Sequence, residues 1–165
     1  MAAKNELVDS PVRQEVNITR IFDAPRELVF KMWTDPELVE KWWGPKDFTN
    51  PVCTLDPWVG GSIRIVMQGP NGVRYPTRGV FTKIVAPELI VFHNIKEDDN
   101  GKAELEVINT VTFTEEDGKT KMLFNARVIM STPEACQSVD GMNNGWNQSI
   151  DRFAETLDRL IHQPQ

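Results

Sequence analysis

The sequence predicts an α+β fold in which a curved antiparallel sheet of about 6–7 strands wraps around one long C-terminal helix. Apolar and polar residues alternate over most of residues 50–130, and each reversal is marked by Gly, Pro, Asn or Asp. Residues 133–162 instead repeat their apolar residues at helical spacing. An antiparallel sheet with one apolar face needs a cover, and only this last helix is long enough to provide it. A curved sheet around a straight helix favours a cavity between the two.

The chain begins with a tail and a first strand. Residues 1–14 are polar and show no periodicity, so we expect a flexible tail there. Glu15–Phe22 alternates apolar and polar residues, which predicts a strand. Residues 15–162 are enough for a single domain with a core of its own.

Two short helices are predicted after strand 1. Asp23 is the expected N-cap of a helix over Pro25–Trp33. Thr34 or Asp35 is the expected cap of a second helix, which has Pro36 in its first turn. A tight turn therefore joins the two helices.

Adjacent tryptophans, Trp42 and Trp43, end the second helix just before a Gly44-Pro45 stop. Consecutive helix positions are about 100° apart, so we expect the two rings to diverge. Both residues continue the apolar stripe of the helix, which gives them a mainly structural role. One ring is a candidate lid at the mouth of the cavity or a candidate dimer contact.

The longest helical pattern follows Thr132, which we expect to cap a helix that has Pro133 at its first position and ends near His162. Gly141 and Gly145 weaken its first half, so a break or kink is expected near Gly141. One continuous apolar face of this helix carries Met142, Trp146, Ile150, Phe153, Leu157 and Leu160.

Composition and charge exclude several classes of function. The 165 residues are 40% hydrophobic and 25% charged, with a net charge of -6 and no cluster of Lys or Arg, which argues against nucleic acid or an anionic membrane as partner. Cys53 and Cys136 form no C-x-x-C motif, so we expect no metal, no disulfide framework and a reducing cytoplasm. No segment has the apolar length of a secretory signal or a membrane span.

Catalytic chemistry has little support in the residues, and we assign no catalytic residue and no cofactor. His162 is expected to face solvent in the last helix, and His93 lies at the polar parity or near the end of a strand. Most acidic residues fall in turns or on helix faces, where solvation explains them. No G-x-S-x-G, H-E-x-x-H or phosphate-loop motif occurs.

A pocket for an apolar ligand has more support, because large and adaptable side chains share the inward parity of the strands. Tyr75, Trp146 and Met142 are the strongest candidates, and Asn109 is a possible buried anchor. Arg127 has the opposite parity and is expected outside. The alternative is that most of these residues simply fill the core. The candidate pocket residues are Trp43, Ile65, Met67, Tyr75, Phe81, Asn109, Phe113, Phe124, Met142, Trp146 and Ile150.

Four segments, "ITRIFDAPRELVFKMWTDPELVEKWWGP", "WVGGSIRIVMQGPNGVRYPTRGVFTKIVAPELIVF", "TVTF" and "GWNQSIDRFAETL", resemble the START-like (SRPBCC, birch-pollen-allergen-like) superfamily. Within it the chain is similar to the branch named after the activator of the heat-shock protein 90 ATPase. The resemblance implies a helix-grip fold over residues 15–161. It also implies either a site for lipids, hormones or polyketides between sheet and helix, or the stimulation of a chaperone ATPase. Some members of the superfamily are enzymes.

Three hypotheses remain open at this point. The first is a small-molecule-binding domain, monomeric or homodimeric, which requires an apolar cavity of several hundred cubic ångströms. The second is a chaperone-interaction domain, which requires a contact surface outside the cavity. The third is a cyclase-like or hydrolase-like enzyme, which requires a titratable residue with a hydrogen-bonded partner inside the cavity.

Overall fold

The structure is a computed structural model that describes residues 14–135 and 139–162. The tail expected over residues 1–14 therefore lies outside the described residues, except for Gln14. The carbonyl oxygen of Gln14 accepts a hydrogen bond from the amide of Val128 at 3.1 Å. The chain is thus attached to the sheet one residue before the first strand.

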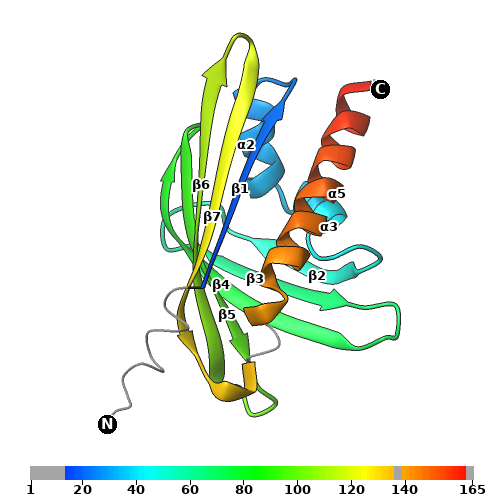
Figure 1. The fold of residues 1–165 in the computed structure, drawn as a ribbon, viewed down its shortest axis with the longest axis vertical. Helices are drawn as coiled ribbons and strands as arrows, with labels where there is room; N and C mark the ends of the chain where they lie inside the picture. Colours follow the sequence, from blue (N-terminus) through cyan, green and yellow to red (C-terminus); the bar gives the residue numbers. More distant parts are fainter. Residues whose placement is uncertain (1–13, 136–138, 163–165) are drawn as a thin grey trace.

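Seven strands form one antiparallel sheet, as the sequence predicted, in the order β1-β7-β6-β5-β4-β3-β2. Four of the six pairings contain a register shift, and such bulges bend strands. The bend is visible in Figure 1, where β6 and β7 run along the long axis while β2 and β3 lie across it. The strands are β1 (Glu15–Phe22), β2 (Thr49–Leu55), β3 (Ser62–Gln68), β4 (Arg74–Val85), β5 (Leu89–Glu97), β6 (Ala103–Glu116) and β7 (Lys119–Ser131).

The turn between β6 and β7 shows how local sequence sets the pairing. Asp117 and Gly118 both have positive φ, 54° and 79°. Positive φ at both central residues defines the two-residue turn whose twist matches that of antiparallel strands, and an Asp-Gly pair adopts it easily. The turn aligns the two longest strands of the sheet, and both bury side chains at alternate positions.

Helices α2 (Arg26–Thr34) and α3 (Pro36–Trp42) follow β1, as expected. Asp35 caps α3, because its Oδ1 accepts a hydrogen bond from the amide two residues later at 2.9 Å. The expected cap of α2 was wrong: Pro25 occupies the N-cap position, and no side chain caps this helix. Asp23 lies two residues before the cap position, so it is not placed to pair with the amides of the first turn.

The C-terminal helix α5 (Met142–His162) begins later than expected. Thr132 does not cap it, because α5 begins only at Met142, and both the amide and the Oγ1 of Thr132 donate to Glu104 O, at 2.9 and 3.4 Å. Only a 3₁₀ turn, η2 (Pro133–Ala135), follows directly. The expected break near Gly141 is confirmed, since a turn at this residue precedes the helix. α5 lies on the same side of the sheet as α2 and α3 (Figure 1).

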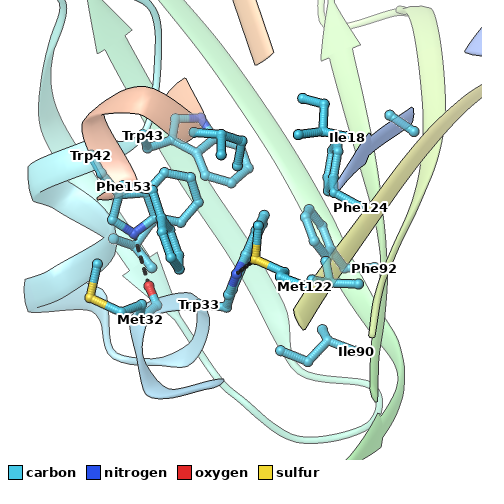
Figure 2. Close-up of a cluster of buried hydrophobic side chains, with 14 of the residues drawn as sticks. Ile18, Met32, Trp33, Trp42, Trp43, Ile90, Phe92, Met122, Phe124 and Phe153 are labelled. Carbon is cyan, nitrogen blue, oxygen red and sulfur yellow. Dashed lines mark hydrogen bonds between the residues drawn. The ribbon is translucent and has the colours of Figure 1, made fainter. Parts of the chain in front are cut away.

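Trp33 of α2 is the centre of the core (Figure 2). Its ring lies 4.8 Å from that of Trp42, 5.7 Å from that of Phe124 and 5.7 Å from that of Phe153, measured between centroids. Both indole N–H groups have partners: Trp33 Nε1 donates to Met122 Sδ at 3.4 Å, and Trp42 Nε1 donates to a carbonyl of α2 at 2.9 Å. This aromatic cluster joins α2, α3, α5 and the sheet.

Candidate functional site

A pocket of about 200 Å³ lies between the first half of α5, the turn after α3 and the inner face of strands β3 to β6. Its walls are mostly apolar, with polar side chains on β4 and β5, on β6 and on α5. The pocket is smaller than the sites that usually hold drug-sized ligands. The lining residues are Trp43, Gly44, Pro45, Met67, Thr77, Asn94, Lys96, Leu105, Val107, Asn109, Met142, Gly145, Trp146 and Ser149.

Of the two adjacent tryptophans, Trp43 is the one that lines the pocket, while Trp42 is fully buried in the core. The expectation that their rings diverge was wrong: the centroids are 5.6 Å apart and the planes are inclined by 48°. Trp42 ends the helix and Trp43 keeps a helical φ of -66°, so the two Cβ bonds still diverge and the side-chain torsions bring the large rings together. The rings of Trp43 and Trp146 are nearly perpendicular, inclined by 79°, with centroids 5.2 Å apart.

Side chains of α5 hold the turn that forms one rim of the pocket. Ser149 Oγ accepts a hydrogen bond from the amide of Gly44 at 3.1 Å, and Gln148 Oε1 accepts one from the amide of Lys46 at 2.9 Å. The amides of this turn therefore bind to the helix rather than to solvent. The turn and the helix therefore lie against each other and form adjacent parts of the pocket wall.

Arg152 completes this attachment from the next turn of α5. Its Nη1 donates to the carbonyl oxygens of Trp43, Gly44 and Pro45 at 3.1, 2.9 and 2.9 Å, and its Nη2 donates to Lys41 O at 3.2 Å. The guanidinium thus binds carbonyls of the last turn of α3 and of the turn that follows it, where Trp43 O also accepts from Asn50 Nδ2 and Pro45 O from the Phe48 amide. Burial lowers the pKa of Arg152, and the nearby charges of Asp47 and Glu155 oppose this shift.

The sheet side of the pocket carries two linked amides. Asn109 of β6 is fully buried, and its Nδ2 donates to Asn94 Oδ1 at 2.7 Å and to Phe92 O at 3.3 Å. Asn109 Oδ1 and Asn94 Nδ2 are buried and have no hydrogen-bond partner among the described residues. Buried polar atoms are rarely left unpaired in folded proteins, so this pair is a notable feature of the wall.

A lysine and a glutamate form the charged end of the same wall. Lys96 Nζ lies 2.5 Å from Glu104 Oε1, and both side chains are largely buried. Glu104 lies at the register shift between β5 and β6, next to Leu105. Lys96 lines the pocket, so this is a titratable residue with a bonded partner at the site, the arrangement that the enzyme hypothesis requires.

Five of the eleven candidate pocket residues line the pocket: Trp43, Met67, Asn109, Met142 and Trp146. Tyr75 is half-buried outside it, with its ring 5.9 Å from that of Phe48. The remaining candidates are buried in the hydrophobic core, where Ile65 and Phe81 border a second void of only about 10 Å³. These core residues are Ile65, Phe81, Phe113, Phe124 and Ile150.

Sequence reasoning found Asn109 but missed the other polar members of the wall. Asn94 and Lys96 share the parity of the buried Phe92, so alternation along β5 could have identified them as residues of the inner face. Ser149 follows Trp146 by one helical turn, and its spacing could also have been noticed. The role of Arg152 could not have been predicted from the sequence, because it depends on the carbonyls of a turn that is distant along the chain.

The residues considered for catalysis lie elsewhere. His93 is on the opposite face of β5, with Nδ1 3.2 Å from Glu106 Oε2, and His162 pairs with Asp158 on the exposed end of α5. Arg127 is exposed, as predicted. Within the described ranges no three His, Cys, Asp or Glu side chains are grouped as a metal site would need. No helix in the described part of the chain has both the length and the hydropathy to span a membrane.

The bent antiparallel sheet, the long C-terminal helix on its inner side and the two short helices after β1 define a protein of the helix-grip, START-like class. The sequence profile of the family described as "Activator of Hsp90 ATPase homolog 1-like protein" matches residues 23–158, and the chain belongs to this family. The match includes both short helices, all strands except β1, and most of α5.

Solved structures resemble the chain over nearly its whole length. A protein from Arthrobacter aurescens is 26% identical with a TM-score of 0.77, and the match covers 88% of this chain and 87% of that one. A Mycobacterium smegmatis protein is also 26% identical, with a TM-score of 0.74 and coverages of 96% and 94%. An AHSA1 protein from Silicibacter pomeroyi, 23% identical with a TM-score of 0.74 and coverages of 90% and 99%, has the same fold. No curated protein matches the chain significantly.

Proposed function

We propose that the protein binds a small, largely apolar molecule in the pocket between α5 and strands β3 to β6. The observation that carries the proposal is the pocket itself, whose walls combine two tryptophans and two methionines with a few buried polar groups. This composition is typical of ligand sites, in which apolar walls supply affinity and a few polar groups fix orientation. Met67 and Met142 are unbranched and can adapt their shape to a ligand.

The size of the pocket limits the size of the ligand. An apolar cavity of about 150 Å³ is large enough to hold benzene. A pocket of about 200 Å³ therefore suits a molecule of one ring with a substituent, or a short branched chain. Long lipids and polyketides would need the pocket to open further.

Native mass spectrometry of freshly purified protein tests the proposal, because it reports a bound molecule and the oligomeric state together. We expect a mass increment that disappears on denaturation. A Gly145→Leu variant should lose it, since Gly145 lines the pocket and a side chain there would extend into it. Asn144→Leu is the matched control, because Asn144 is exposed one residue away. Equal occupancy in the two variants would contradict the proposal.

A second candidate function, stimulation of a chaperone ATPase, is favoured by the description of the family. Its test is the ATPase rate of an Hsp90-type chaperone with and without the protein. Stimulation that survives Gly145→Leu would favour a contact outside the pocket, and no stimulation at saturating protein would exclude this role. The homodimer and the cytoplasmic location expected from the sequence stay predictions.

A further inference from the structure

We infer that the ligand carries one neutral polar group with a hydrogen-bond donor beside an acceptor, such as a primary amide or a lactam, which pairs with Asn109 and Asn94. This inference rests on the proposed function, because it names the chemistry of a ligand in the same pocket. It is carried by two buried atoms of the pocket wall that have no partner within the described part of the chain, Asn109 Oδ1 and Asn94 Nδ2.

The orientation of the Asn109 amide is fixed by the backbone. A carbonyl oxygen can only accept, so the atom of Asn109 that faces Phe92 O at 3.3 Å must be the Nδ2 donor. The same Nδ2 donates to Asn94 at 2.7 Å, so the atom of Asn94 that faces it must be Oδ1. The remaining atoms are therefore an acceptor on Asn109 and a donor on Asn94. Neighbouring amides that present one acceptor and one donor match a ligand group of the same kind.

The charges at this wall favour a neutral group over an anion. Lys96 is the cation among the pocket-lining residues, and Glu104 lies 2.5 Å from its ammonium. A carboxylate ligand at this end would meet Glu104 as well as Lys96, and the repulsion would offset the attraction. An amide has no such conflict and supplies both the donor and the acceptor that the asparagines need.

Both free atoms are covered in this structure, so the bound state requires a local rearrangement. Met67 and Met142 are the most adaptable side chains of the pocket, and a change of rotamer in either is a small movement for an unbranched side chain. A ligand that reaches the asparagines satisfies two buried polar atoms at once. The protein should therefore bind such a ligand more tightly than a ligand whose polar group lies at the solvent-exposed rim.

Three ligands of nearly equal shape test the inference by NMR titration of the full-length protein: benzamide, benzoate and toluene. We expect benzamide to bind about tenfold more tightly than either of the others, which is the size of one net hydrogen bond. If toluene binds as tightly as benzamide, or if benzoate binds most tightly, the inference is wrong while the proposed function stands. If none of the three binds, the proposed function fails and the inference fails with it.

Variants separate the role of the asparagines from their effect on folding. Asn94→Leu and Asn109→Leu should each remove the preference for benzamide while toluene still binds. Asn125→Leu is the matched control, because Asn125 lies on the outer face of β7 with its Nδ2 bonded to Glu15 and Asn17. Retention of the preference in a folded Asn94→Leu variant would overturn the inference even if Asn109→Leu fails to fold.

Discussion

The two ends of the sheet's inner face use the same strands in opposite ways. On β6, Val111 and Phe113 belong to the packed half, which we define as the aromatic core around Trp33. Two and four residues before Val111, at the same parity, Asn109 and Val107 line the pocket and belong to the open half. The same change from large apolar to smaller or polar residues occurs along β5. The pocket thus lies where the residue type changes along one continuous face of the sheet.

α5 repeats this division along its own length. Ile150, Phe153 and Leu157 are fully or almost fully buried in the packed half. One or two turns earlier, Met142 and Trp146 are only half-buried, and Gly145 between them has no side chain to fill the space. One helix therefore closes the core with its second half and lines the pocket with its first. The comparison predicts that the stability of the fold and the proposed ligand binding depend on different residues.

Truncation of one large side chain in each half should give the largest contrast. Phe153→Ala removes a ring that contacts Phe22, Trp33 and Trp42, so we expect a loss of about 3–5 kcal/mol in the free energy of unfolding. Met142→Ala should cost only about 1 kcal/mol, because this side chain is half-buried at the pocket. Urea unfolding measures both, and similar losses would contradict the division into two halves.

The division also explains which parts of the fold could be predicted from sequence. Alternation and turn residues predict the seven strands, because both follow from local chemistry that a single strand or turn already contains. The start of α5 was placed too early because Thr132 and Pro133 form a good local cap, while the actual structure there depends on a hydrogen bond to Glu104 from another strand. At Thr132 the hydrogen bond to a distant strand outweighs the local preference for a helix cap.

The site was harder to predict for a related reason. Phe113 and Asn109 have the same parity, so periodicity placed both on the inner face, but only packing decides that one faces the core and the other the pocket. Tyr75 shares this parity too and lies beyond the pocket against Phe48. The face of a side chain follows from local spacing. Whether that side chain then contacts the core or the pocket depends on where α5 lies over the sheet.

Removal of the Arg152 guanidinium should produce the next largest effect. The variant tests where the boundary between the two halves lies. Arg152→Met leaves up to four carbonyls of the pocket rim without this donor, so we expect a loss of about 2 kcal/mol. Arg152→Lys should lose about half of that, because a lysine keeps the charge but not the planar fork. Arg159→Met, at an exposed position of the same helix, serves as control.

Hydrogen exchange shows whether Arg152 acts on the rim specifically. In Arg152→Met, the amides of Gly44 and Lys46 should exchange faster than in the wild type, because the turn that they anchor to α5 is loosened. Amides of the packed half should change only in proportion to global stability. A uniform increase across the chain would mean that Arg152 supports the whole fold rather than the pocket rim.

A smaller effect of opposite sign is expected at Gly145. Alanine is a better helix former than glycine, and an added Cβ would meet only Pro45 Cγ, at an ordinary contact distance of 3.9 Å. We therefore expect Gly145→Ala to raise the free energy of unfolding by about 0.5 kcal/mol while it reduces the space in the pocket. A denaturation curve and a toluene titration measure the two changes. A loss of stability would mean that the open half is packed more tightly than the pocket implies.

The smallest effect concerns Cys53, which lies on β2 beneath α3 with its Sγ 3.6 Å from Pro36 O. Burial, and to a lesser extent the charge of Glu40, raise the pKa of the thiol from 9.0 to about 11. Below pH 9 the thiol keeps its proton in both folded and unfolded chains, so it contributes no pH dependence there. Between about pH 9 and pH 11 the unfolded chain ionises first, so the folded state loses stability as the pH rises.

Urea unfolding at about pH 8 and about pH 10 measures the contribution of the Cys53 thiol to the pH dependence of stability. The two chains to compare are the single variant Cys136→Ser and the double variant that carries Cys53→Ser as well. The chain that retains Cys53 should lose more stability between the two pH values, because serine does not titrate in this range. An equal loss in both chains would show that water reaches the thiol and stabilises its ionised form. Water would then penetrate beneath α3, and the packed half would be less closed than its aromatic contacts imply.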